Sequence, residues 1–233
     1  MSVAEERKHR IYGCTFIQAI GCRLELAQLT ISTAMVYFHR FFARESFTVY
    51  KYEYIAATCV YLACKVEESS RKASDVATAC IQYRPNRGSS DEEKAKIIRA
   101  ILWHEHILLD ILCFDFTVEH PYRFLIDFAE ELGTSETTLQ AAWAFANDSL
   151  RLTLCLLYPP HVIAAGCLLL AYRLNSEQLP RDGDLVVSQV VQVLRQTQIL
   201  LRVYERTDTD HIIVITAINN TTIVIAIIIT NDL

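Results

Sequence analysis

One run of apolar residues constrains the fold more than any other part of the chain. From Tyr54 to Cys64, Thr58 is the only polar residue. The run predicts a helix from about Tyr52 to Glu67, and a helix that is apolar on all sides is either buried by its neighbours or spans a membrane. A span needs about 20 residues, and this helix is shorter. We therefore expect it at the centre of a helical bundle.

Capping residues and apolar spacing predict further helices around this one. Ser2 with Glu5, and Ser90 with Glu93, match the capping-box pattern at a helix start. Pro85–Ser90 is expected to be a loop because it carries proline and glycine. The other helices expected in the first half are Ser2–Arg10, Phe16–Ala27, one capped by Thr30 that reaches Phe42, Ala73–Gln82 and Ser90–Cys113.

A proline marks the start of the second half. Pro121 disfavours a helical conformation at His120, so Phe114–His120 is predicted to be an extended linker. Gly133 is expected to stop the first helix after it. The helices predicted here are Tyr122–Leu132, Ser135–Leu154, His161–Leu174 after Pro159-Pro160, and Leu185–Arg206.

The order of helices in the second half is similar to that in the first, which indicates a weak internal duplication of a five-helix unit. We predict an all-α chain of two tandem five-helix domains, with a shortened second domain and an atypical tail. The expected divisions are 1–10 as an N-terminal helix, 11–117 as the first domain, 118–206 as the second and 207–233 as the tail.

The tail differs in kind from the rest of the chain. Ile212–Ile218 and Thr221–Thr230 are β-branched runs on either side of Asn219-Asn220, a pair that tolerates positive φ. The segment could form a hairpin, remain disordered, or be an appended piece foreign to the fold. The sequence leaves these alternatives open.

Composition excludes several classes of partner and site. The net charge of the 233 residues is −5, with no run of Lys or Arg, so direct nucleic-acid binding is not expected. The eight cysteines include no C-x-x-C pair and are expected to be reduced core residues. The polar start, Glu5–Lys8, argues against a signal peptide. Polar residues 219–222 interrupt Ile212–Ile229, so no membrane span is expected.

The sequence contains no pattern that is typical of a catalytic site. His104-Glu105-His106 places two histidines two residues apart, on different sides of a helix, where they cannot share a metal ion as in zinc proteases. His39 and His161 are expected to pack or to form hydrogen bonds. No phosphate-binding glycine loop is present. We therefore expect no enzymatic activity, no metal, no cofactor and no small-molecule substrate.

Two charged residues stand where apolar ones are expected. Glu105 interrupts an apolar stripe at helical spacing, and Lys65 ends the apolar run that begins at Tyr54. A charge buried alone is costly. Either both side chains reach solvent at the helix edges, or the two helices pack side by side. In the second case Lys65 and Glu105 meet and offer charge-assisted hydrogen bonds to a partner's backbone.

Several segments together resemble the cyclin family. Leu29–Phe41, Leu62–Glu68 and Leu112–Phe116 are similar to parts of the cyclin box. Glu119–Tyr122 and Ala142–Leu150 resemble the second box of the transcriptional K, L and T types. The similarity runs from about residue 11 to 174 and more loosely to 206. Some features lean toward the L type and others toward the K type.

The resemblance implies two stacked five-helix domains that bind and activate a cyclin-dependent kinase as a heterodimer. It implies a nuclear protein, acting on the C-terminal domain of RNA polymerase II or in linked RNA processing. The Met-Arg-Ala-Ile-Leu docking motif of cell-cycle cyclins is absent from the expected helix, which favours a transcriptional type. The kinase-binding residues that the resemblance implies are Lys65, Glu105, Leu62, Val66, Phe114 and Phe116.

Two other functions remain open at this stage. A cyclin-fold general transcription factor would bind promoter DNA, which requires a basic face and strong salt dependence; the charge of −5 opposes it. A cyclin-fold scaffold would bind without activating any kinase, and the presence of Lys65 and Glu105 disfavours this alternative.

Overall fold

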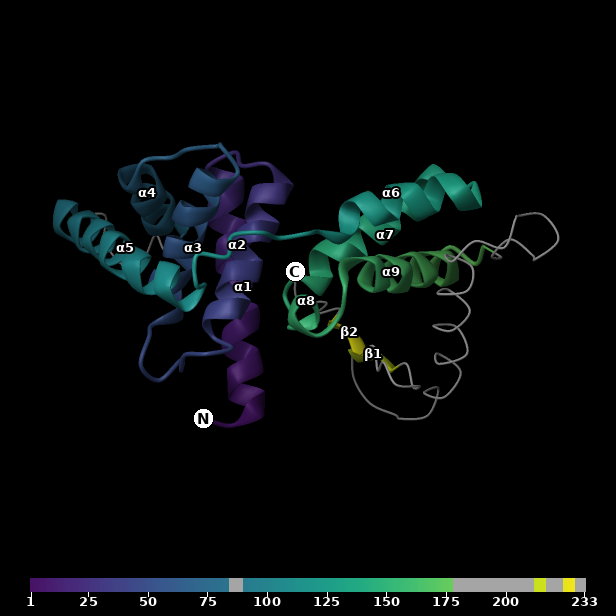
Figure 1. The fold of residues 1–233 in the computed structure, drawn as a ribbon, viewed down its shortest axis with the longest axis horizontal. Helices are drawn as coiled ribbons and strands as arrows, with labels where there is room; N and C mark the ends of the chain where they lie inside the picture. Colours follow the sequence, from purple (N-terminus) through teal and green to yellow (C-terminus); the bar gives the residue numbers. More distant parts are fainter. Residues whose placement is uncertain (84–89, 178–211, 217–223, 229–233) are drawn as a thin grey trace. The chain divides into compact units, whose positions relative to one another are not determined.

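The computed structural model describes residues 1–83, 90–177, 212–216 and 224–228 (Figure 1). The chain divides into two compact units, Met1–Val118 and Glu119–Leu233. Three expectations lie wholly or mostly outside the described residues: the helix Leu185–Arg206, the loop Pro85–Ser90, of which only Ser90 is described, and the turn at Asn219-Asn220.

The helices of the first unit surround one central helix, α3 (Tyr52–Val66), which contacts all four others. Its residues 55–60 and 62–64 are buried. The prediction of a central buried helix is therefore confirmed. The surrounding helices are α1 (Val3–Arg23), α2 (Gln28–Phe41), α4 (Ala73–Tyr83) and α5 (Asp91–Ile111).

Helix α1 is a correction, because two separate helices were expected between Ser2 and Ala27. The capping box at its start is present: the Ser2 side chain accepts from Glu5 N at 3.2 Å, and the Glu5 carboxylate accepts from Ser2 N at 2.8 Å. Gly13 is buried inside the helix, where glycine is usually unfavourable. An added Cβ there would lie directly on the Phe38 ring. Close packing against α2 thus outweighs the low helix propensity.

The start of α2 also differs from the expectation. The cap residue is Ala27 rather than Thr30, and no side chain caps the helix. Thr30 lies within the helix, buried, with its hydroxyl 3.3 Å from that of Ser69. The threonine hydroxyl is therefore engaged with the segment after α3 rather than with a backbone N–H of the first turn.

A buried arginine joins α1 to α2. The Arg10 guanidinium donates to the carbonyl oxygen of Phe42 at 2.7 Å and to the Glu6 carboxylate at 2.7 Å. It also lies 3.3 Å from Nδ1 of His39, whose Nε2 is 3.3 Å from the Cys14 sulfur. His39 is thus a buried hydrogen-bonding residue, as predicted.

The second unit is arranged around α9 (Pro160–Leu174), which packs on α6 (Pro121–Leu132), α7 (Glu136–Ser149) and the short α8 (Leu154–Leu157). Residues 163–172 of α9 are buried. Gly133 ends α6 with φ of 59°, as its predicted stop role requires. The predicted length of the helix Ser135–Leu154 is wrong, because the observed helix α7 ends at Ser149. The hydroxyl of Ser149 donates locally to the carbonyl of Ala146 at 2.7 Å.

Beyond the helices, strands β1 (Ile212–Thr216) and β2 (Val224–Ile228) pair antiparallel, with Ile212 opposite Ile228. Residues 1–83 and 90–177 form their regular structure from helices alone. The chain therefore has the predicted all-α fold class, with one strand pair in its tail.

Replacing Gly13 by alanine is expected to destabilise the first unit. The new methyl group would overlap the Phe38 ring, and overpacking of a core typically costs about 1–3 kcal/mol. Urea denaturation followed by circular dichroism measures the loss. Ala95→Gly on the exposed side of α5 is a control for propensity alone and should cost about 1 kcal/mol. An unchanged midpoint for Gly13→Ala would contradict the packing of Phe38 on α1.

The second unit should lose stability in mild acid because of His120. Burial lowers the pKa of His120 from 6.5 to about 4. The unfolded chain therefore takes up this proton at a higher pH than the folded chain, and the free energy of unfolding falls as pH drops from about 6.5 to 4. When the free energy of unfolding is measured at several pH values, its slope against pH should be shallower for His120→Gln than for the exposed control His161→Gln. Equal slopes for the two variants would show that His120 does not cause the loss of stability in acid.

Candidate functional site

Lys65 and Glu105 meet on the surface of the first unit. Lys65 leaves the last turn of α3, and its Nζ donates to Oε1 of Glu105 on α5 at 2.6 Å. The side chain of Lys65 is 42% exposed and that of Glu105 13% exposed. Of the two alternatives that the sequence left open, the structure shows the second: the helices pack side by side and the two residues meet, with Lys65 the more accessible of them.

An aromatic ring completes the surroundings of Lys65. Its Nζ lies 4.2 Å from the centroid of the Tyr61 ring, one turn earlier on α3, which is a cation–π contact. Tyr61 was missed by the sequence analysis. Its position four residues before Lys65 is the signal that could have indicated it.

The surroundings raise the pKa of Lys65. Burial alone would lower that pKa, but hydrogen bonds to Glu105 and Tyr61 favour the charged form and shift it above 10.5. A raised lysine pKa contributes stability that is present below pH 10.5 and is lost as the pH rises through the folded value. Lys65 is thus a fixed cation at physiological pH.

The apolar residues expected beside the pair differ in accessibility. Phe114 is 63% exposed, and Phe116 and Val66 are partly buried. Leu62 is buried and offers little surface to a partner. The rings of Phe114 and Phe116 lie edge to face, with centroids 6.1 Å apart. Leu62 can therefore support the site from beneath, while Phe114 is the accessible apolar group.

Side chains of α2 hold the segment that carries these phenylalanines. The Tyr37 hydroxyl donates to the carbonyl of Phe116 at 2.9 Å. The Arg40 guanidinium donates to the carbonyls of Asp115 and Thr117 at 3.1 and 3.0 Å. Neither positioning residue could be recognised from the sequence, because neither breaks the local pattern of α2. They fix the backbone of residues 115–117, which lies outside any helix or strand. Phe114 itself is in a turn with φ of 57°, so the extended linker expected from Phe114 onward does not include this residue.

The histidines of α5 point to different sides of the helix, as their spacing predicted. His104 stacks against Tyr54, with ring centroids 6.1 Å apart, and its Nδ1 lies 2.6 Å from the Ala100 carbonyl. His106 is exposed. Within the described ranges, no three His, Cys, Asp or Glu side chains are grouped so that they could hold a metal ion.

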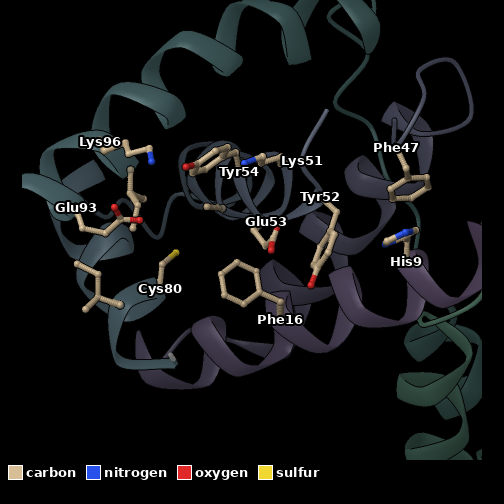
Figure 2. A pocket seen from close by; sticks show the side chains of 13 residues that line it. His9, Phe16, Phe47, Lys51, Tyr52, Glu53, Tyr54, Cys80, Glu93 and Lys96 are labelled. Carbon is tan, nitrogen blue, oxygen red and sulfur yellow. The ribbon is translucent and has the colours of Figure 1, made fainter. Parts of the chain in front are cut away.

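A cavity of about 370 Å³ lies at the other end of α3 (Figure 2). Figure 2 shows Phe16, Tyr52 and Tyr54 around it, from α1 and the start of α3. From residue 53 to residue 65 is about 18 Å along a helix, so the cavity is separate from the Lys65–Glu105 pair. Nδ1 of His9, at its edge, is buried without a hydrogen-bond partner. The size suits one side chain or a small ligand.

Comparison with known proteins identifies the family. The family model described as "Cyclin, N-terminal domain" matches residues 2–117. The chain belongs to the cyclin family. The match covers the whole of α1 to α5, including both members of the Lys65–Glu105 pair.

Two relatives extend the similarity of this cyclin-family chain beyond the first unit. It is 40% identical over 186 residues to Cyclin pch1 of Schizosaccharomyces pombe, an alignment that covers 77% of this chain and 54% of pch1. It is 39% identical over 181 residues to Cyclin-T1-4 of Arabidopsis thaliana, covering 74% of this chain and 34% of that protein. The chain thus spans about half or less of the length of these relatives.

A solved structure supports the fold. A chain in the yeast RNA Pol II CTD kinase CTDK-1 complex superposes with a TM-score of 0.69 over 83% of this chain and 65% of that one. The sequences are 21% identical, so the likeness establishes the fold alone. Among the described residues, no helix is long and apolar enough to cross a membrane.

The Lys65–Glu105 pair should contribute little to stability. Exposed ion pairs are typically worth about 0–1 kcal/mol, and Lys65 is 42% exposed. A double-mutant cycle with Lys65→Met and Glu105→Gln, measured by urea denaturation, should give a coupling of about 1 kcal/mol or less. A coupling several times larger would assign the pair to the fold rather than to binding.

Proposed function

We propose that this chain is the regulatory cyclin subunit of a nuclear cyclin-dependent serine/threonine kinase that acts in transcription by RNA polymerase II or in linked RNA processing. Membership of the cyclin family supports the kinase partner. Similarity to a T-type cyclin and to a chain in an RNA Pol II CTD kinase complex supports the transcriptional role. A nuclear location follows from that role.

The observation that carries the proposal is the partly exposed Lys65–Glu105 pair. A lysine and a carboxylate that are already paired can each bond a partner's backbone, the lysine as donor and the carboxylate as acceptor. The kinase segment expected to dock here is the mobile helix that carries its conserved glutamate. The exposed ring of Phe114 offers an apolar contact beside these polar ones.

The proposed mechanism is allosteric, and this chain performs no chemistry. A protein kinase is active only when the glutamate of its mobile helix pairs with its strand lysine and its activation loop is ordered. A surface that binds the inward position of that helix raises the population of the active state. The equilibrium between the inactive and active kinase states can shift only by the difference in this chain's binding free energy for the two states.

The test is co-purification of the kinase from nuclear extract with the wild-type chain and with Lys65→Ala/Glu105→Ala. Loss of one member of a hydrogen-bonded charge contact typically costs about 2–5 kcal/mol, so kinase recovery should fall sharply. Phosphorylation of a peptide carrying the repeats of the RNA polymerase II C-terminal domain measures activity. Arg123→Ala/Asp127→Ala removes an exposed ion pair of α6 and is the matched control.

Two outcomes would contradict the proposal. If the double variant recovers as much active kinase as the wild-type chain, Lys65 and Glu105 are not part of the kinase interface. Recovery of a kinase without activation of it would favour the scaffold alternative.

A further inference from the structure

The outer face of α5 has an unusual distribution of charge. The helix begins with three acidic residues, 91–93, which suit the positive end of the helix dipole. From Lys94 to His104 no acidic residue occurs, while Lys94, Lys96 and Arg99 are basic. The whole chain is acidic, with a net charge of −5. The dipole does not explain three basic residues in the body of the helix.

The same face exposes two large apolar side chains. Trp103 is 68% exposed and Leu102 44% exposed. With Arg99 and His106 they follow the spacing i, i+3, i+4 and i+7, which places all four on one face. A shallow depression there is lined by Lys96, Arg99, Ala100, Leu102, Trp103 and His106. The small side chain of Ala100 leaves the hollow between the larger ones. These six residues are called the α5 patch below.

The α5 patch is neither core nor part of the Lys65–Glu105 pair. At about 100° per residue, Trp103 lies about 160° around the helix from Glu105. Leu102 lies between the two. In the part of the chain that the structure describes, no acidic side chain forms an ion pair with Lys96 or Arg99. Arg99 therefore has no ion-pair partner among the described residues, while Lys96 also lines the cavity at the start of α3.

The chemistry of the α5 patch fits an acidic protein segment. Tryptophan and arginine are the residue types most enriched at binding hot spots, and a partly apolar centre with a charged rim is typical of interfaces. Nucleic acid fits less well, because its binding depends mainly on Lys and Arg side chains that neutralise phosphates along the backbone. The α5 patch has two fixed cations, and the acidic residues 91–93 and Asp110 flank it.

We propose that the α5 patch is a second docking surface, which binds an acidic segment of a partner protein through Arg99 and Lys96 and seats an aliphatic side chain of that segment against Trp103 and Leu102. The surface is distinct from the proposed kinase site and does not depend on that function. A partner bound there can be held while the Lys65–Glu105 pair is occupied.

The probe is a short fluorescein-labelled peptide of Asp and Glu residues around two leucines, titrated into the purified full chain and followed by fluorescence anisotropy. A peptide of the same length with Asn and Gln in place of the acids is the control. The acidic peptide should bind the chain, and its affinity should fall as salt is raised. The neutral peptide should bind at least about tenfold more weakly.

Two variants locate the binding. Trp103→Ala and Arg99→Glu should each lower the affinity for the acidic peptide by about tenfold or more, as expected for hot-spot residues. Arg123→Glu, at an exposed arginine of α6, should leave its affinity unchanged. Trp103 and Arg99 are exposed, so the helical circular dichroism of their variants should match wild type. Kinase recovery by Trp103→Ala should also match wild type.

Several results would overturn the proposal. Equal binding of the acidic and neutral peptides would show that charge complementarity does not drive binding at the α5 patch. Loss of kinase recovery with Trp103→Ala would assign the α5 patch to the kinase interface. Competition by duplex DNA at lower concentration than the peptide would assign it to nucleic acid. Failure of kinase recovery by the wild-type chain would overturn the proposed function and leave the peptide result standing.

Discussion

Burial of α3 on every side is the constraint on which the first unit depends. A helix whose residues 55–60 and 62–64 are all buried needs a neighbour in each direction, and α1, α2, α4 and α5 supply them. The burial also determines where a binding site can form. At its last turn α3 emerges from the core, and there Lys65 is the charged residue that meets Glu105 on α5. The site is therefore a place where the central helix becomes accessible.

Local signals made much of the fold predictable. Each of these signals acts through one side chain or one backbone preference. In the structure, Ser2, Ser90 and Pro121 lie at helix starts and Gly133 lies at a helix end, as predicted. One failure came where tertiary packing outweighed such a preference. Gly13 lies within a continuous helix because the Phe38 ring occupies the space that a side chain would need.

The candidate site was predictable for a similar reason and only in part. A carboxylate on an apolar stripe and a lysine ending an apolar run are anomalies that a sequence displays, so Lys65 and Glu105 could be expected to meet. Tyr61 breaks no pattern, because aromatic residues are ordinary in such a helix. Tyr37 and Arg40 act on the backbone 75 or more residues away. No local pattern in the sequence reports contacts at that separation.

The contact of Lys65 with both Glu105 and Tyr61 has a consequence for affinity. A lysine side chain loses about 1.5–2 kcal/mol of rotamer freedom when it is fixed in one geometry. Here much of that entropy is lost when the domain folds, since Nζ is already held 2.6 Å from the carboxylate and 4.2 Å from the ring centre. A partner meets a preorganised donor and so bears a smaller ordering cost than it would with a free lysine. Tyr61, which need not touch the partner, thereby contributes to the strength of the complex.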